Sequence, residues 1–283
     1  MRRVAVLSFT IALLACALLL CFGAATSRPA GKKSYLGFDA NDYPGDEALP
    51  ILRKTFSFTG YWLSSPPGTK STSWLGKRNT LRAQAFGFLV LWNGPETRKL
   101  KSAADAQEKG RRDAEAAAKT AHQEGFPAGT VIFLDVEEGG RLSPAYHVYV
   151  SQWIDTLAHE NFRAGVYCSA MPVSEGGGVT ITTSQDLQDQ LAGRKLVFFL
   201  YNDACPPAPG CTFPKTPPTP GEGGFAGASL WQYAQSPRRK QYTAQCAATY
   251  AADGNCYAPG DTAHKWFLDA EVADSPDPSA PAH

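Results

Sequence analysis

The chain has 283 residues, and its 27 lysines and arginines nearly balance its 26 aspartates and glutamates, for a net charge of +1. This balance gives no indication of a nucleic acid or an anionic surface as partner, and it argues against a long polyanion as substrate. The length suits one large domain or two small ones. The histidines show no metal-binding spacing, so we expect neither a metal nor a cofactor.

Residues 1–25 are predicted to be a secretory signal peptide, because two arginines precede a long apolar run that ends in small residues, with cleavage after Ala25. One alternative is a membrane anchor, since the run is nearly long enough to span a bilayer. Another is a lipoprotein modified at Cys16. The cleaved form predicts a secreted or periplasmic protein without a membrane span, and a short linker at 26–34.

Eight short runs rich in aromatic and β-branched residues follow, and each is a predicted strand. They cover residues 35–39, 58–63, 86–92, 130–137, 163–169, 196–201, 229–234 and 266–272.

Helical segments separate the middle strands, at residues 102–125, 143–161 and 183–193. Alternation of strand and helix predicts a parallel sheet covered by helices, and eight strands match an α/β barrel of the (β/α)₈ TIM type over residues 35–272. The alternative is an open doubly wound sheet. That fold favours a glycine-rich phosphate loop after an early strand, and "GFDANDYPG" is not one.

The last third of this barrel is expected to be irregular. Residues 202–227 contain seven prolines, which lack an amide hydrogen and clash within a helix, so no crossover helix fits there. The segment before the eighth strand is also irregular. Residues 273–283 are expected to form a flexible tail.

Five cysteines lie beyond the signal peptide, and export permits disulfides. Cys205 and Cys211 bracket the proline-rich loop, and Cys246 and Cys256 bracket a second short segment. We therefore predict two local bridges, Cys205–Cys211 and Cys246–Cys256, and a free, buried Cys168. The alternative is that all five are reduced.

Carboxylates stand at the ends of three predicted strands, where barrel active sites lie. Asp39 ends the first strand, Asp135 and Glu137 end the fourth, and Asp269 and Glu271 end the eighth. Because side chains alternate along a strand, Asp135 and Glu137 share one face, with their Cβ atoms roughly 7 Å apart. Glu138 is expected to be a structural loop residue. Aromatic and amide side chains near other strand ends form a candidate sugar-binding set: Trp62, Trp92, Tyr167, Tyr201, Trp231, Gln232 and Tyr233.

The motifs "GFDAND", "FLDVEEG", "GVYCS", "LWQYA" and "FLDAEVAD" resemble those of the family 25 lysozyme-like glycoside hydrolases. They are closer still to a related bacterial glycoside-hydrolase-like domain. The resemblance covers residues 35–272 and implies an irregular barrel whose last three strands lack regular helices. It also implies that Asp135 and Glu137 are the catalytic pair, supported by Asp39 and Asp269, and that Tyr167 and Trp231–Tyr233 contact substrate.

The resemblance implies cleavage of a β-linked cell-wall or related polysaccharide. We predict that Glu137 is the general acid, with a pKa raised by neighbouring anions, and that Asp135 stays ionised. If the sugar carries an N-acetyl group, Asp135 is expected to orient it as the internal nucleophile, with retention of configuration.

The third strand departs from the family 25 pattern, because Trp92 and Asn93 stand where a Lys-Ala-(Thr/Ser)-Glu-Gly segment is usual. Two alternatives therefore stay open: a non-catalytic binder of carbohydrate or cell wall that keeps the barrel, and an exported hydrolase of another bond, such as an amide. In each case we expect a monomer.

Overall fold

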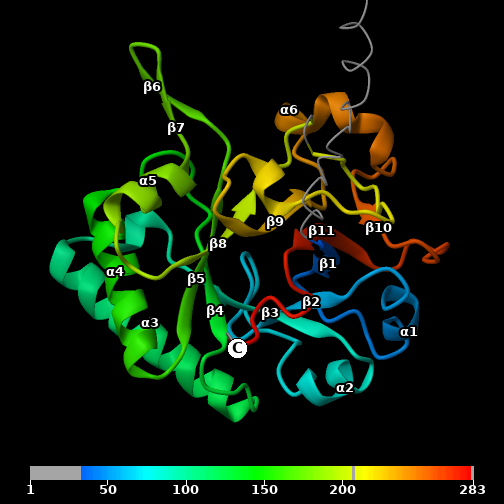
Figure 1. The fold of residues 1–283 in the computed structure, drawn as a ribbon, viewed down its shortest axis with the longest axis horizontal. Helices are drawn as coiled ribbons and strands as arrows, with labels where there is room; N and C mark the ends of the chain where they lie inside the picture. The colour runs from blue at the N-terminus through cyan, green and yellow to red at the C-terminus, as the bar shows by residue number, and fades with distance from the viewer. Residues whose placement is uncertain (1–32, 206–207, 282–283) are drawn as a thin grey trace, which may run out of the picture. The chain divides into compact units, whose positions relative to one another are not determined.

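The structure, a computed structural model, describes residues 33–205 and 208–281. A ring of eight strands forms a closed barrel in which each strand is hydrogen-bonded to two neighbours (Figure 1). In ring order the strands are β1 (Tyr35–Asp39), β2 (Phe58–Trp62), β3 (Gly87–Asn93), β4 (Val131–Asp135), β5 (Arg163–Ser169), β8 (Val197–Tyr201), β9 (Ala228–Ala234) and β11 (Phe267–Ala273).

All eight predicted barrel strands are confirmed, with ends within two residues of those expected. The predicted signal peptide, Cys16 and most of the linker lie outside the described residues. Within the described part of the chain, no helix has the length and apolar character needed to cross a membrane.

The direction of the last barrel strand differs from the parallel arrangement that was expected. The seven strands from β1 to β9 run parallel to their neighbours, but β11 is antiparallel to both β9 and β1. A parallel strand requires a crossover connection to return the chain to the other end of the sheet. The connection 235–266 contains no such crossover, so β11 starts at the end of the barrel where β9 stops.

Three predicted helices are confirmed: α3 (Ala103–Gln123), α4 (Pro144–His159) and α5 (Thr183–Gln190). Side-chain caps start α3 and α4, because the hydroxyl oxygens of Ser102 and Ser143 accept bonds from backbone amides of the first turn. The two long helices pack against each other on the β4–β5 side of the barrel (Figure 1). Gly110 permits this contact, since a Cβ atom there would lie 2.6 Å from the Tyr149 carbonyl oxygen.

Several short elements were not predicted. Two strands form a separate hairpin that projects beyond the barrel (Figure 1), and a two-residue strand extends the sheet beside β11. These elements are β6 (Val173–Gly176), β7 (Val179–Ile181), β10 (Cys256–Tyr257), α1 (Leu49–Leu52), α2 (Arg78–Ala83), α6 (Lys240–Thr243) and the 3-10 helices η1 (Thr97–Lys99), η2 (Pro220–Gly223) and η3 (Ala244–Thr249). As expected, no α-helix connects β8 to β9 in the described residues.

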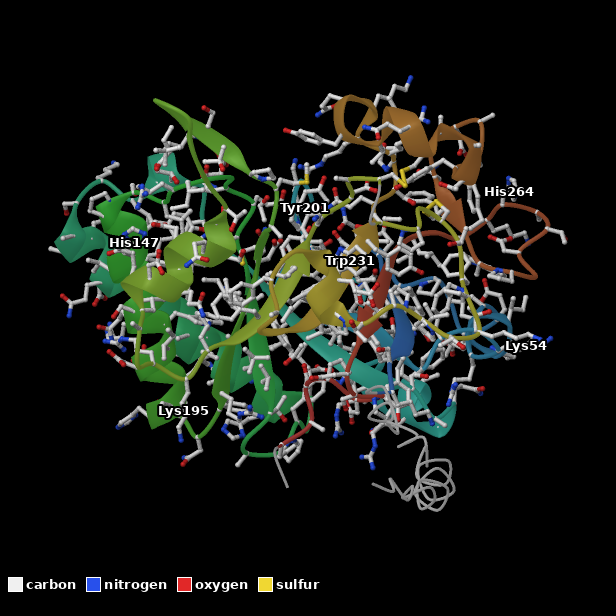
Figure 2. All side chains as sticks on the ribbon, turned by 45° about the horizontal axis from the view of Figure 1, so that its top comes forward. Lys54, His147, Lys195, Tyr201, Trp231 and His264 are labelled. Atoms are coloured by element: carbon white, nitrogen blue, oxygen red, sulfur yellow. A yellow bond between two sulfur atoms is a disulfide. The ribbon has the colours of Figure 1, made fainter. Side chains whose placement is uncertain are left out.

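Two disulfides join the proline-rich loop to the connection between β9 and β11 (Figure 2). They pair Cys205 with Cys246 and Cys211 with Cys256, and their Cα atoms are 5.7 and 5.2 Å apart. The predicted local pairs were therefore wrong, because the two segments lie side by side and each cysteine faces the other segment. The prediction of a free, buried Cys168 is confirmed.

The C-terminal segment was expected to be flexible, but it is bound to the barrel. The Ser279 carbonyl oxygen accepts a hydrogen bond from the Val131 amide, and the Ser279 amide donates to the Phe88 carbonyl. The Ser279 hydroxyl and the Asp277 carboxylate also accept bonds from the Val90 and Phe88 amides. Residues up to 281 thus cross the end of the barrel where β3 and β4 begin.

Candidate active site

A cavity of about 790 Å³ opens at the end of the barrel where the seven parallel strands finish. We call this end the mouth. Four of the predicted acids line the cavity: Asp39, Asp135, Glu137 and Asp269. Strands β1, β4 and β11 thus bring together carboxyl groups that are far apart in the sequence.

Two inward-facing glycines make room for this arrangement. A Cβ atom on Gly60 would lie 2.5 Å from the Cβ atom of Asp39, and one on Gly165 would lie 2.3 Å from the Phe133 ring. Phe133 packs edge-on against Phe199 across the interior, at 6.1 Å between ring centroids. The barrel is therefore filled by aromatic rings below the mouth, while β1 and β2 approach closely enough to hold Asp39.

The antiparallel direction of β11 decides how deep its acids lie. Asp269 is paired in register with Asp39, whereas Glu271 is paired with Gly37, two residues deeper on the same face. Glu271 has no exposed surface and does not line the cavity. The expectation that both acids end their strand at the mouth was wrong, because β11 begins at the mouth: Asp269 lies near its start, and Glu271 lies farther along the strand and is deeply buried.

The carboxyl groups of Glu271 and Asp39 lie close enough to each other to share a proton. No N–H or O–H group of the protein donates to either Glu271 oxygen. Burial raises the pKa of Glu271 well above its usual value, and the charges of Asp39 and Asp269 raise it further. We therefore assign a proton to Glu271, which donates it to Asp39. Burial also raises the pKa of Asp39, although this hydrogen bond opposes the rise.

Gln232 joins two acids to the aromatic side of the site. Its amide nitrogen donates to Asp39 Oδ2 at 3.0 Å and to Asp269 Oδ2 at 3.3 Å. Its amide oxygen accepts from the Tyr167 hydroxyl at 2.6 Å and from the Gln235 amide at 2.8 Å. The side-chain amide of Gln232 thus donates two hydrogen bonds and accepts two, and these bonds hold its neighbours in place.

Asp135 and Glu137 are also within hydrogen-bond reach of each other, but their surroundings differ. Burial, followed by the charges of Glu137 and Asp39, raises the pKa of Asp135 well above its usual value. The Glu137 side chain is 48% exposed, and its Oε2 atom lies 3.6 Å from a terminal nitrogen of Arg239. Burial thus favours the neutral form of Asp135, which runs against the prediction that Asp135 stays ionised.

Arg239 is a functional candidate that the sequence reasoning missed. Its guanidinium lies 4.9 Å from the centroid of the Tyr201 ring, and this contact holds it over the mouth. Arg238 and Lys265 line the same cavity. The sequence did carry a signal for the two arginines. The run "SPRRK" begins two residues after the seventh predicted strand, so it must lie at the mouth.

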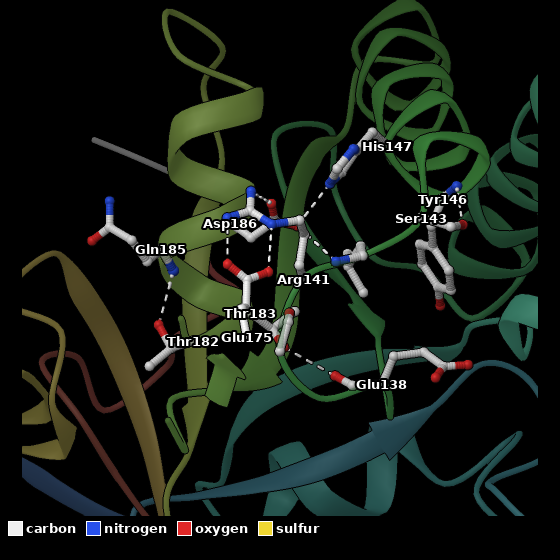
Figure 3. Close-up of polar contacts among 12 residues, drawn as sticks. Glu138, Arg141, Ser143, Tyr146, His147, Glu175, Thr182, Thr183, Gln185 and Asp186 are labelled. Atoms are coloured by element: carbon white, nitrogen blue, oxygen red, sulfur yellow. Dashed lines mark hydrogen bonds and ion pairs between the residues drawn. The ribbon is translucent and has the colours of Figure 1, made fainter. Parts of the chain in front are cut away.

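A polar network fixes the loop that follows β4 (Figure 3). The buried Asp186 carboxylate accepts bonds from the Leu142 amide at 2.9 Å and the His147 ring at 2.7 Å, and it lies 3.4 Å from Arg141. The expected structural role of Glu138 is confirmed, because its Oε1 atom accepts from the amide of Thr97 at 2.7 Å. The loop that carries Glu137 is thus anchored from both sides.

The predicted sugar-binding aromatics divide into two groups. Trp62 and Tyr167 line the cavity. Trp231 (Figure 2) and Tyr233 are fully buried on the opposite face of β9 from Gln232. They donate to the carbonyl oxygens of Asn202 and Thr212, which belong to the proline-rich loop. Their assignment as substrate contacts was therefore wrong.

Trp92 and Tyr201 also do not line the cavity. The Trp92 ring faces α4, at 6.4 Å from the ring of Trp153. Tyr201 is 4% exposed and lies beneath Arg239, so it can act on a ligand only through that arginine. Among the residues that the structure describes, no set of three His, Cys, Asp or Glu side chains is arranged to hold a metal ion.

Comparison with solved structures supports the barrel. An uncharacterised protein of B. stearothermophilus is 17% identical with a TM-score of 0.51, and the match covers 84% of this chain and 95% of that one. The Mycobacterium tuberculosis Tat-secreted protein Rv2525c is 14% identical, with a TM-score of 0.46 and coverage of 84% and 94%. The Clostridium perfringens spore cortex lytic enzyme SleM is 16% identical, with a TM-score of 0.49 and coverage of 86% and 68%. The likeness to the B. stearothermophilus protein concerns the fold alone.

A search of curated proteins found no match. The model of the Rv2525c-like, glycoside hydrolase-like domain family matches residues 64–205, from the end of β2 to the start of the proline-rich loop. This range includes Asp135, Glu137 and Tyr167, three of the residues that line the cavity. The chain therefore belongs to the family of Rv2525c-like, glycoside hydrolase-like domains.

Proposed function

We propose that the protein is an exported glycoside hydrolase that cleaves a β-linked polysaccharide of the cell wall or a related glycan. One observation carries this proposal: Asp135 and Glu137 are in hydrogen-bond reach of each other at the mouth of the barrel. Glycoside cleavage needs an acid that protonates the leaving oxygen and a negative charge near the developing oxocarbenium ion. A carboxyl pair that shares one proton can supply both.

In the proposed reaction, a bound glycan removes water from the half-exposed Glu137 and separates it from Arg239. Loss of solvent and of the cation favours the protonated form of Glu137, so the proton of Asp135 moves to Glu137 along their hydrogen bond. Glu137 then donates this proton to the glycosidic oxygen as the bond to the anomeric carbon breaks, and the bonding electrons stay with that oxygen. Asp135 is left ionised beside the positive charge.

The separation of the two carboxyls suggests which nucleophile follows. Retaining enzymes that use a carboxylate nucleophile keep their pair about 5–5.5 Å apart, so that the sugar fits between the two groups. A pair in hydrogen-bond reach leaves no such space, so Asp135 is not proposed as the attacking group. We propose that the N-acetyl oxygen of the substrate attacks the anomeric carbon and that Asp135 orients this group. Trp62 and Tyr167 supply the ring faces on which the sugar packs.

Export is part of the proposal. The two disulfides require an oxidising compartment, and residues 1–25 have the composition of a signal peptide. N-terminal sequencing of the exported protein is expected to start near Thr26, and an intact Met1 would contradict this.

The test is incubation of the purified protein with a panel of cell walls and polysaccharides, with new reducing ends as the measurement. General acid catalysis contributes typically about 10²–10⁴-fold, so Glu137→Gln should lose activity by that factor while still binding the glycan. Asp135→Asn should also be inactive. Glu138→Gln is the matched control, because Gln keeps an acceptor for the Thr97 amide, and it should retain activity. Full activity of both the Glu137 and the Asp135 variants would refute the assignment.

A second candidate function is a carbohydrate-binding protein without turnover, and the contact between Arg239 and Glu137 favours it. While that contact persists, the guanidinium 3.6 Å away competes with a glycosidic oxygen for the Glu137 carboxyl. Arg239→Gln separates the two candidates. It should raise the rate of an enzyme that must break the contact, and it should produce no reducing ends from a binding protein.

A further inference from the structure

A second cavity, of about 800 Å³, lies at the end of the barrel opposite the mouth. Its walls include Tyr35 and Phe88, which stand at the starts of β1 and β3, and Thr130, which precedes β4. Residues of the C-terminal segment from Pro276 to Pro281 close one side. The barrel interior separates this cavity from the candidate active site, and the proposed function makes no use of it.

Three arginines line this cavity: Arg53, Arg78 and Arg82. They come from two separate parts of the chain, because Arg53 follows α1 while Arg78 and Arg82 lie on α2. Burial and the neighbouring charge of Arg82 lower the pKa of Arg78. Three like charges around one cavity repel each other, so something must offset this cost in the folded protein.

The protein supplies partial compensation, because the charges of Asp277 and Glu124 oppose the fall in the pKa of Arg78, but none of it is a direct ion pair. Among the described residues, none of the three arginines has a carboxylate oxygen within 4.0 Å. The Nε atoms of Arg53 and Arg78 are buried and have no hydrogen-bond acceptor. Asp277 is the one carboxyl that lines the cavity, and its Oδ1 atom accepts a bond from the Phe88 amide.

Packing holds two of the guanidinium groups in place. Arg78 lies over the ring of Phe126, at 4.8 Å from its centroid, and 5.8 Å from that of Phe88. Arg53 lies 5.7 Å from the centroid of Phe86, and its Nη1 atom donates to the Phe56 carbonyl oxygen at 3.0 Å. Side chains fixed in this way lose little entropy when they bind an anion.

We infer that this cavity is a binding site for a small oxyanion of the phosphate class, held by Arg53, Arg78 and Arg82. Guanidinium groups present forked N–H donors that match the oxygens of phosphate and carboxylate groups. The charge favours phosphate, because three arginines face the single carboxyl of Asp277 among the described lining residues, which leaves a local charge of at least +2. A phosphate dianion neutralises this charge, whereas a single carboxylate leaves half of it.

The test is a calorimetric titration of the full-length mature protein with inorganic phosphate at pH 7.5 and constant ionic strength, with acetate as the monoanion. We expect saturable binding of one phosphate per chain and affinity for acetate at least ten-fold weaker. Arg78→Gln should raise the Kd for phosphate at least ten-fold, and the more exposed Arg82→Gln should raise it several-fold without changing the thermal unfolding midpoint. Arg163→Gln is the matched control, because Arg163 is exposed at the start of β5 but does not line the cavity.

Phosphate binding that disappears in the Arg78 and Arg82 variants and persists in the Arg163 variant would support the site. The inference would be overturned if the wild-type protein showed no saturable phosphate binding. It would also be overturned if the Arg78, Arg82 and Arg163 variants all lost phosphate affinity to the same extent. If Arg78→Gln fails to fold, Arg82→Gln alone decides, since unchanged phosphate affinity in that variant contradicts the inference. Glu137→Gln should bind phosphate normally, so this result is independent of the proposed enzyme activity.

Discussion

Replacing Glu271 with glutamine should change how the stability of the protein depends on pH. Glu271 has no exposed surface and is assigned the proton in its hydrogen bond with Asp39. A carboxyl whose pKa is raised by folding keeps a proton that the unfolded chain loses above about pH 4.3. Its contribution to stability is therefore complete at low pH and is lost as the pH rises toward the folded-state pKa.

The size of this pH dependence follows from the difference in bound protons between the native and the unfolded state. When the native state holds one proton more than the unfolded state, the free energy of unfolding falls by about 1.4 kcal/mol for each pH unit. Buried carboxyls with raised pKa values include those of Asp39, Asp135, Asp203 and Glu271. The wild-type protein should thus lose at least about 1.4 kcal/mol between pH 5 and pH 6. Glu271→Gln removes one titrating group and should flatten this slope by about the same amount.

The assay is urea unfolding followed by tryptophan fluorescence at pH 5, 6 and 7, with the disulfides intact. Glutamine matches the shape of glutamate and can still donate to Asp39, so the variant should fold. Glu115→Gln is the control, because Glu115 is exposed on α3 and should leave the slope unchanged. A wild-type stability that rises with pH over this range, or equal slopes for the Glu271 variant and the wild type, would refute the assignment of the proton.

Three further predictions concern stability and titration. Replacing Cys205 and Cys246 together with serine opens a loop whose ends are 41 residues apart, and should cost about 4 kcal/mol in urea unfolding. Peptide mapping without reduction should recover this pair, and a peptide linking Cys205 to Cys211 would contradict the structure. Gly60→Ala should cost about 1–3 kcal/mol because its new methyl group meets β1, whereas Gly139→Ala, whose methyl group would make only an ordinary contact with Val173 at 3.9 Å, should change little. Burial raises the pKa of Asp203 to about 7, so its carboxyl carbon resonance should titrate near neutral pH; a midpoint near 4 would be incompatible with its buried position.

The barrel was predictable because its strands carry a strong local signal. Runs such as "VIFLD" and "LVFFLY" are short, aromatic and β-branched, and the structure places strands at both. The hairpin β6–β7 lacked this signal, because "VSEGGGVTI" is interrupted by glycines and most of its residues are exposed. Local pattern also carries no information about strand direction, so the reversal of β11 could not be read from "WFLDAEV".

The site was predictable only in part, because local sequence pattern shows which face of a strand a residue occupies but not which distant segments meet there. Alternation along β4 correctly brought Asp135 to the cavity, and position at a strand end did the same for Asp39. Alternation along β9 could have shown that Gln232 faces away from Trp231 and Tyr233. The pairing of the cysteines and the contact of Arg239 with Glu137 depend on loops that meet in space, and no spacing in the sequence specifies such a meeting.

The reversed direction of β11 has a consequence for how this barrel could be modified. In a regular (β/α) unit each connection returns to the far end of the barrel, so only a short part of it borders the mouth. Here the connection 235–266 leaves β9 and enters β11 at the same end, and both of its ends line the cavity.

The two disulfides attach the middle of this connection to the proline-rich loop, and β10 within it also pairs with β11. The stretches between these fixed points could be lengthened, shortened or exchanged with little change to the strand register beneath them. Directed libraries confined to these stretches would alter which ligands enter the mouth while leaving the carboxyl groups of β1 and β4 in position.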